Sequence, residues 1–185
     1  MTGGDDLARA LEQAIDQHGR SLAALCDERP MLVVFLRHGG CTFCRQVLSD
    51  LARQRRELEG RGLGITLVHM DPTPAADELI ERHGLGGLSR VADPRRCLYQ
   101  AFDLGRAASG QLLSPRVWWR GLVCCILRGH GMGRFRGDVR QLPGSFVVYR
   151  RRIVSAHRPN TPADRPDFCI IVGQADAADP LEPPP

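Results

Sequence analysis

Six consecutive apolar residues, Met31 to Leu36, lie shortly before a pair of closely spaced cysteines, and this arrangement strongly constrains the fold. An unbroken apolar run of this length predicts a strand that is buried on both faces, as in a parallel sheet. Two glycines end the run, Cys41 and Cys44 follow, and apolar residues then recur at helical spacing from Phe43 onward. The sequence therefore predicts a Cys-x-x-Cys motif at a strand-to-helix turn, on the first turn of the helix.

This position suggests redox chemistry for the two cysteines. The first amides of a helix have no internal partners and, together with the helix dipole, favour a thiolate at Cys41. Cys44 lies on the same helical face, so its sulfur can reach Cys41 and close a disulfide. Arg37 and His38 add hydrogen-bond donors and positive charge beside the turn. A zinc knuckle or two buried structural cysteines are the alternatives, but a zinc knuckle usually needs a second ligand pair, which the spacing does not offer.

The length and the cysteine count limit the class of protein. The chain has 185 residues, long enough for one domain with a sizeable core. Seven cysteines at irregular spacing cannot form a complete set of internal disulfides, so a reducing compartment fits better than a secreted fold. The acidic start lacks the pattern of a signal peptide, and no apolar run could span a membrane. We therefore expect a cytoplasmic protein that does not enter membranes.

All 25 basic residues are arginines, and the absence of lysine excludes a lysine Schiff base and a Walker-A lysine. Between Arg116 and Arg165 there are eleven arginines and only two acidic residues, Asp138 and Asp164. Such a segment is usually a solvated face. The alternative is a non-catalytic adaptor whose arginine-rich surface binds an acidic partner or nucleic acid. Nucleic acid is disfavoured because Phe135 is the only aromatic residue within the glycine- and arginine-rich stretch from Arg128 to Gly137.

Hydrophobic periodicity and turn residues predict an alternating α/β order. The predicted helices span residues 5–19, 21–26, 42–59 and 75–83, one that starts at 93–94, and 116–127. The predicted strands span residues 31–36, 65–70, 88–92, 145–149 and 153–156, with a final strand at 169–172. Residues 1–173 should form a single domain, and the acidic, proline-rich residues 174–185 should be a disordered tail.

This order of elements resembles the thioredoxin fold, a three-layer α/β/α sandwich. Here it would have a helical, arginine-rich insertion near residues 105–140, before the final β-hairpin. The segment from Leu142 to Val148 is similar to the superfamily loop in which a cis-proline precedes a core strand. The resemblance implies a cis bond before Pro143, and it implies that Leu142 and Pro143 face the cysteines and help to bind substrate.

Three stretches are similar to the peroxiredoxin-like, AhpC/TSA-antioxidant-like group of this superfamily. They are Val34 to Arg45, Leu98 to Gly105, and Gly137 to Val148, followed by His157 and Asp164 at the spacing of that group. The resemblance implies a thiol-dependent antioxidant or reductase without a cofactor or bound metal. Cys41 would attack a peroxide or disulfide and Cys44 would resolve the adduct. A thioredoxin- or glutathione-type thiol would then regenerate the pair, and a homodimer is left open.

The other five cysteines receive no role in this interpretation. Cys124 and Cys125 are adjacent, so helical geometry would point their side chains apart, and we expect them to fill the core. Cys97 and Cys169 should be buried for the same reason, whereas Cys26 should be partly exposed. His69, at the end of a predicted strand, should be structural.

Overall fold

The structure is a computed structural model that describes residues 3–37, 42–105, 140–159, 164 and 166–178. The strands form one five-stranded sheet in the order β3-β2-β1-β4-β5. Their bounds are β1 Met31–Phe35, β2 Gly64–His69, β3 Ser89–Ala92, β4 Gly144–Tyr149 and β5 Arg152–His157. β1 pairs in parallel with β2 and β2 with β3, while β4 is antiparallel to both β1 and β5. The predicted strands at these five places are confirmed.

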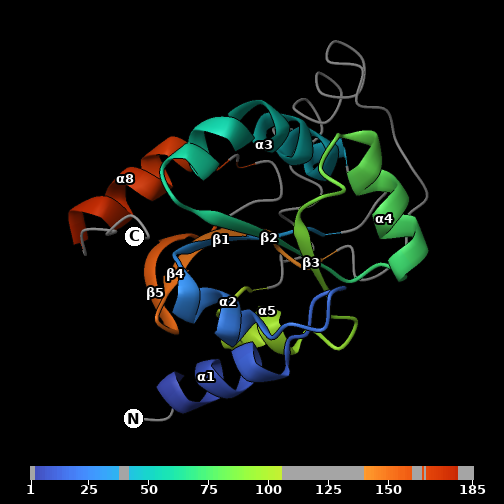
Figure 1. The fold of residues 1–185 in the computed structure, drawn as a ribbon. Helices are drawn as coiled ribbons and strands as arrows, with labels where there is room; N and C mark the ends of the chain where they lie inside the picture. The colour runs from blue at the N-terminus through green and yellow to red at the C-terminus, as the bar shows by residue number, and fades with distance from the viewer. Residues whose placement is uncertain (1–2, 38–41, 106–139, 160–163, 165, 179–185) are drawn as a thin grey trace.

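The helices cover both faces of the sheet, which confirms the three-layer α/β/α sandwich (Figure 1). One face packs against α1 (Gly3–Gln13), α2 (Leu22–Glu28) and α5 (Cys97–Ala101). The other packs against α3 (Thr42–Gly60), α4 (Thr73–Arg82) and α8 (Phe168–Ala178). The predicted insertion near residues 105–140, including its helix, falls almost entirely outside the described residues.

Side-chain alternation along β1 supplies both cores. Leu32 and Val34 join the cluster under α3 and α8, whereas Met31, Val33 and Phe35 join the cluster under α1, α2 and α5. All five residues of the strand are buried, as expected for a central strand that is covered on both faces. The position of β1 in the middle of the sheet fixes where the chain must turn into α3.

The first predicted helix is too long. α1 ends at Gln13, and the chain then forms a turn that is held by the carboxylate of Asp16, whose Oδ1 accepts the amides of His18 and Arg20 at 2.9 Å each. Gly19 lies in this turn with a φ of 81°, a backbone conformation that suits glycine. A short polar side chain that hydrogen-bonds nearby amides therefore ends the helix earlier than the apolar pattern suggests.

The predicted final strand at residues 169–172 is wrong, because these residues belong to α8. Phe168, Ile171, Val172 and Ala175 are buried at helical spacing against the α3 side of the sheet, while Ile170 is 58% exposed. The helix continues to Ala178, so residues 174–178 are helical rather than part of a disordered tail. The rest of the predicted tail, residues 179–185, lies outside the described residues.

Candidate redox site

Cys44, the second cysteine of the Cys-x-x-Cys motif, lies at the start of α3. β1 ends at Phe35 and α3 begins at Thr42, so Cys44 is in the first turn of a helix that directly follows the central strand. The Cys44 side chain is buried, with 4% exposure. Cys41 and His38, the other two predicted catalytic residues of this turn, lie outside the described residues.

The Cys44 sulfur is held by the backbone of the preceding loop. The amide nitrogen of Arg37 donates a hydrogen bond to Cys44 Sγ over 3.2 Å. A hydrogen bond of this kind favours negative charge on an acceptor over its neutral form. The chain segment that leaves β1 therefore positions the Cys44 sulfur and supplies a donor to it.

Arg37 is buried, with 5% exposure, and does not lie on the solvent-exposed surface. Its Nε donates to the backbone oxygen of Gln141 over 2.9 Å, which links the loop after β1 to the segment that precedes β4. The main chain of Arg37 thus contacts Cys44 while its side chain contacts the Gln141 segment. The predicted association of Arg37 with the cysteine motif agrees with this geometry, and its catalytic role stays a prediction.

A small hollow of about 10 Å³ adjoins Cys44, which is room for about one water molecule. Its lining residues come from β1, the loop after it, α3, and the segments around Pro143 and Asp164; they are Phe35, Leu36, Arg37, Phe43, Cys44, Val47, Pro143 and Asp164. Pro143 is therefore beside the cysteine motif. Leu142, also predicted to bind substrate, is buried and is not among the residues that line the hollow.

The predicted cis bond before Pro143 is wrong, because the Leu142–Pro143 bond is trans. The trans isomer of an X–Pro bond is favoured by about 0.5–1 kcal/mol unless the surroundings demand the other. Here the Leu142 amide donates to Gly105 O over 3.1 Å, and the Gln141 side chain holds the same segment. These contacts hold the segment around the trans bond in place.

A second hollow adjoins the first and contains His157. The two share four lining residues, namely Phe35, Val47, Pro143 and Asp164. Burial lowers the pKa of His157 from its usual value, and the nearby Asp164 charge opposes that shift. His157 Nε2 is buried and makes no hydrogen bond within the described residues. Of the two residues named by the family resemblance after the hairpin, Asp164 lines the hollow at Cys44, and His157 lines the adjoining one.

Two residues of the site were not identified from the sequence. The Gln141 side chain donates to Leu104 O over 3.0 Å and to Gly105 O over 3.1 Å. The Tyr99 hydroxyl donates to the backbone oxygen of Leu36, next to Arg37. Tyr99 lies in one of the stretches that resembles the family, but its apolar pattern indicated only a core position.

The expectations for the three other described cysteines are wrong: Cys97 and Cys169 were expected to be buried, and Cys26 to be partly exposed. Cys97 is exposed and Cys169 is half-buried, whereas Cys26 is buried with 0% exposure. Cys97 is the first residue of the five-residue α5, and only Leu98 and Tyr99 of that helix are buried. Burial raises the pKa of the Cys26 thiol to about 12, with a smaller effect from Asp27.

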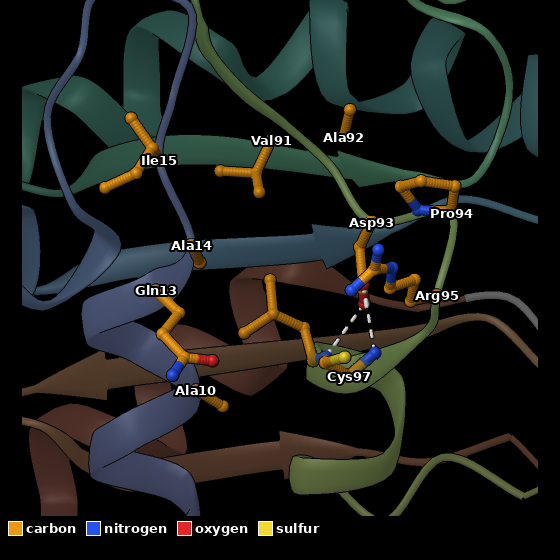
Figure 2. Close-up of a pocket in the computed structure, with 11 residues that line it drawn as sticks. Ala10, Gln13, Ala14, Ile15, Val91, Ala92, Asp93, Pro94, Arg95 and Cys97 are labelled. Atoms are coloured by element: carbon orange, nitrogen blue, oxygen red, sulfur yellow. Dashed lines mark hydrogen bonds between the residues drawn. The ribbon is translucent and has the colours of Figure 1, made fainter.

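A larger cleft, of about 380 Å³, lies away from the cysteine motif. It is formed by the end of α1, the end of β3 and the start of α5, and shares no lining residue with the hollow at Cys44 (Figure 2). Cys97 and the half-exposed Ile15 contribute to its wall. The size of a cavity therefore does not identify the candidate redox site in this protein.

Within the described residues, no group of three or more His, Cys, Asp or Glu side chains is arranged to hold a metal ion. Across the same residues, no helix combines the length and the apolar character needed to cross a membrane.

His69 is buried and its Nδ1 is 3.1 Å from Asp71 O, in agreement with the structural role expected for it.

A family model described as "AhpC/TSA antioxidant enzyme" matches residues 6–160. The chain belongs to this family. A curated relative, "Thioredoxin-like protein AAED1, chloroplastic" from Arabidopsis thaliana, is 26% identical over 93 residues, which are 49% of this chain and 37% of the relative. The match thus spans little more than a third of that relative's length.

Solved structures of low sequence identity share the fold. The peroxidoxin BcpB from Mycobacterium tuberculosis superposes with a TM-score of 0.58 at 14% identity, covering 89% of this chain and 90% of that one. Peroxiredoxin Q from Xanthomonas campestris has a TM-score of 0.58 at 16% identity, covering 91% and 89%. A secreted M. tuberculosis disulfide oxidoreductase homologous to E. coli DsbE has a TM-score of 0.55 at 11% identity, covering 91% and 98%. The thioredoxin-like fold expected from the sequence is therefore confirmed.

Proposed function

We propose that this protein is a thiol-dependent oxidoreductase that reduces a peroxide or a disulfide with Cys41 and Cys44 as its redox pair. The observation that supports this most directly is the buried Cys44 sulfur, which lies in the first turn of α3 and accepts the Arg37 amide over 3.2 Å. A hollow with room for about one water molecule lies beside that sulfur. Membership of the AhpC/TSA antioxidant enzyme family supports the same class of chemistry.

In the proposed peroxide reaction, the Cys41 thiolate attacks one oxygen of the O–O bond. That oxygen becomes a sulfenic acid on Cys41, and the other oxygen leaves as water or an alcohol after it takes up a proton. Cys44 then attacks the Cys41 sulfur, an S–S bond forms, and water leaves. An external dithiol, or two molecules of a monothiol, gives two electrons and two protons to restore both thiols.

With a disulfide substrate, the first step gives a mixed disulfide between Cys41 and one half of the substrate, and the other half leaves as a thiol. Cys44 displaces the remaining half and forms the same internal disulfide. We propose that the Arg37 guanidinium stabilises the negative charge of the attacking or leaving group and that His38 supplies or accepts the proton. Pro143 would border the bound substrate, because it lines the hollow beside Cys44.

The cycle needs an external thiol reductant, which we propose to be of the thioredoxin or glutathione type. Such reductants keep thiols reduced in the cytoplasm. The odd number of cysteines in the chain also fits a reducing compartment. We therefore propose a cytoplasmic location for the reaction.

The test is peptide mass spectrometry after treatment of the purified protein with a small excess of hydrogen peroxide, or with glutathione disulfide in a parallel sample. We expect a loss of two hydrogens that maps to a Cys41–Cys44 disulfide and reverses with dithiothreitol. Cys41→Ser should abolish the product, and Cys44→Ser should accumulate the sulfenic acid or the mixed disulfide. Cys97→Ser is the matched control, because it removes an exposed thiol that is away from the motif.

The two oxidants distinguish the substrate classes. A disulfide that forms faster with peroxide than with glutathione disulfide would indicate a peroxidase, and the reverse order would indicate a disulfide reductase. If neither oxidant gives the Cys41–Cys44 disulfide while Cys97 is modified normally, the proposed function is wrong.

A further inference from the structure

Tyr99 has a buried hydroxyl at the carboxyl ends of the two central parallel strands. The residue has 0% exposure, and its ring contacts the edge of the Phe35 ring at a centroid distance of 4.9 Å. Its hydroxyl contacts two backbone oxygens, those of Leu36 and Val68. The ring alone can supply the packing, so the contacts of the hydroxyl need a separate explanation.

The hydroxyl has one proton and can donate it to only one of these oxygens. The distance to Val68 O is 3.3 Å, and the contact with Leu36 O is shorter. Val68 O already accepts the amide of Leu36 over 2.8 Å. Leu36 O is therefore the preferred acceptor of the Tyr99 proton.

The Leu36 carbonyl and the Arg37 N–H belong to the same peptide unit. A donor that binds the carbonyl oxygen polarises the unit and makes its N–H a stronger donor, so hydrogen bonds in a chain reinforce one another. That N–H donates to Cys44 Sγ over 3.2 Å. The three groups thus form a continuous chain from the Tyr99 hydroxyl, through one peptide unit, to the Cys44 sulfur.

On the basis of the proposed function, we infer that Tyr99 is a positioning residue that stabilises the reduced form of Cys44 through the Leu36–Arg37 peptide unit. A thiol or thiolate sulfur carries more negative charge than a disulfide sulfur and gains more from the strengthened N–H. The chain of hydrogen bonds therefore shifts the Cys41–Cys44 pair toward the dithiol. In the reaction, the dithiol form of the pair is then oxidised less readily, and its disulfide form is reduced more readily by the external thiol.

The carboxylate of Asp93 places Tyr99 for this role. Asp93 Oδ1 accepts the amide of Cys97 over 2.9 Å, and its Oδ2 accepts the amides of Leu98 over 2.8 Å and Tyr99 over 3.4 Å. Burial raises the pKa of the Tyr99 hydroxyl well above its usual value, with smaller effects from the charges of Cys44, Asp93 and Asp71. The hydroxyl therefore keeps its proton and remains a donor throughout the working pH range.

The test measures the equilibrium in which the protein dithiol and glutathione disulfide give the protein disulfide and two molecules of reduced glutathione. Tyr99→Phe keeps the ring and removes the donor. We expect the equilibrium constant to move about twofold toward the protein disulfide, which corresponds to a change of about a fifth in one hydrogen bond to a charged group. Tyr149→Phe is the matched control, because Tyr149 is a half-buried residue at the end of β4, and it should leave the constant unchanged.

Two further measurements keep the inference testable if Tyr99→Phe folds poorly. The chain has only two tyrosines, so 3-fluorotyrosine incorporated into the Tyr149→Phe variant alters Tyr99 alone. Fluorine makes the phenol a stronger donor, and the equilibrium should then move toward the dithiol. By NMR, the amide proton of Arg37 in the reduced protein should shift upfield in Tyr99→Phe and downfield with 3-fluorotyrosine.

The outcomes separate this inference from the proposed function. If the wild-type protein forms no Cys41–Cys44 disulfide with glutathione disulfide or with hydrogen peroxide, the proposed function fails, and the inferred redox role of Tyr99 fails with it. If the wild type forms the disulfide but neither change at Tyr99 moves the equilibrium or the Arg37 amide proton, only the inference is overturned. Opposite shifts for Tyr99→Phe and 3-fluorotyrosine would support it.

Discussion

Gln141 is expected to stabilise the segment that borders the candidate site, and Gln141→Leu tests this. The residue has 2% exposure, and its side chain donates to Leu104 O over 3.0 Å and to Gly105 O over 3.1 Å, with a longer contact of 3.4 Å to Leu142 O. Leucine has a similar volume, so the substitution removes the donors without creating a large cavity. The hydrogen bond from Arg37 to the backbone oxygen of residue 141 can remain, because the main chain is unchanged.

The expected loss of unfolding free energy depends on whether each backbone oxygen keeps another hydrogen-bond donor when the Gln141 side chain is removed. Gly105 O keeps the amide of Leu142 over 3.1 Å, so it does not become unsatisfied. The main loss is at Leu104 O, and a buried backbone acceptor without its partner costs about 1–3 kcal/mol. We therefore expect Gln141→Leu to lower the free energy of unfolding by about 2 kcal/mol, or the melting temperature by roughly 2–4 °C per kcal/mol.

Urea unfolding followed by circular dichroism measures the change, with the slope of the transition checked for constancy. Gln100→Leu is the control, because Gln100 is an exposed residue of α5 and a surface change of this kind is usually within about 0.5 kcal/mol. If Gln141→Leu is no more destabilising than Gln100→Leu, the hydrogen bonds of Gln141 do not stabilise the segment and the reasoning is refuted.

Two further predictions concern His69 and the described cysteines. Burial lowers the pKa of His69 below its usual value of 6.5, so the unfolded chain takes up the proton first and stability should fall as the pH drops below about 6.5. The loss of urea midpoint between pH 7.5 and 5.5 should be smaller in His69→Gln, and an equal loss in both proteins would contradict this. Iodoacetamide should modify the exposed Cys97 in the native protein, whereas Cys26, with its pKa raised to about 12, should react only after unfolding. Modification of native Cys26 at the rate of Cys97 would show that the core around α2 opens.

The sequence predicts the sheet and the layers well because β1 and the helix after it have strong local patterns. The apolar residues of β1 follow one another without a break up to Phe35, and the apolar residues of α3 recur at helical spacing after Cys44. The segment at residues 169–172 was ambiguous, because four apolar residues fit a strand or a helix equally well. The helical spacing of the buried residues over the longer stretch from Phe168 to Ala175 distinguishes a helix from a strand, and both of these residues pack against the same core.

The hydrogen bonds of the site that the sequence does not predict share one physical property. In each of them a side chain donates to a backbone oxygen that is far away in sequence. Tyr99 binds the oxygen of Leu36, 63 residues earlier, and the Gln141 side chain binds that of Leu104, 37 residues earlier. A backbone acceptor has no sequence signature, because every residue supplies one. Cys97 was misplaced for a different reason, since a five-residue helix is too short for its buried face to be identified from periodicity.

The register of the sheet explains why Pro143 remains at the site although its peptide bond is trans. β4 runs antiparallel to β1, and Phe35, the last residue of β1, pairs with Gly144, the first residue of β4. The residue before Gly144 must therefore lie beside the segment that follows Phe35, which is the segment that leads to Cys44. The pairing alone brings Pro143 to the hollow, and it would do so with any residue at position 143. The resemblance was thus right about the place of this loop and wrong about the isomer, because the place is set by strand pairing and the isomer by local contacts.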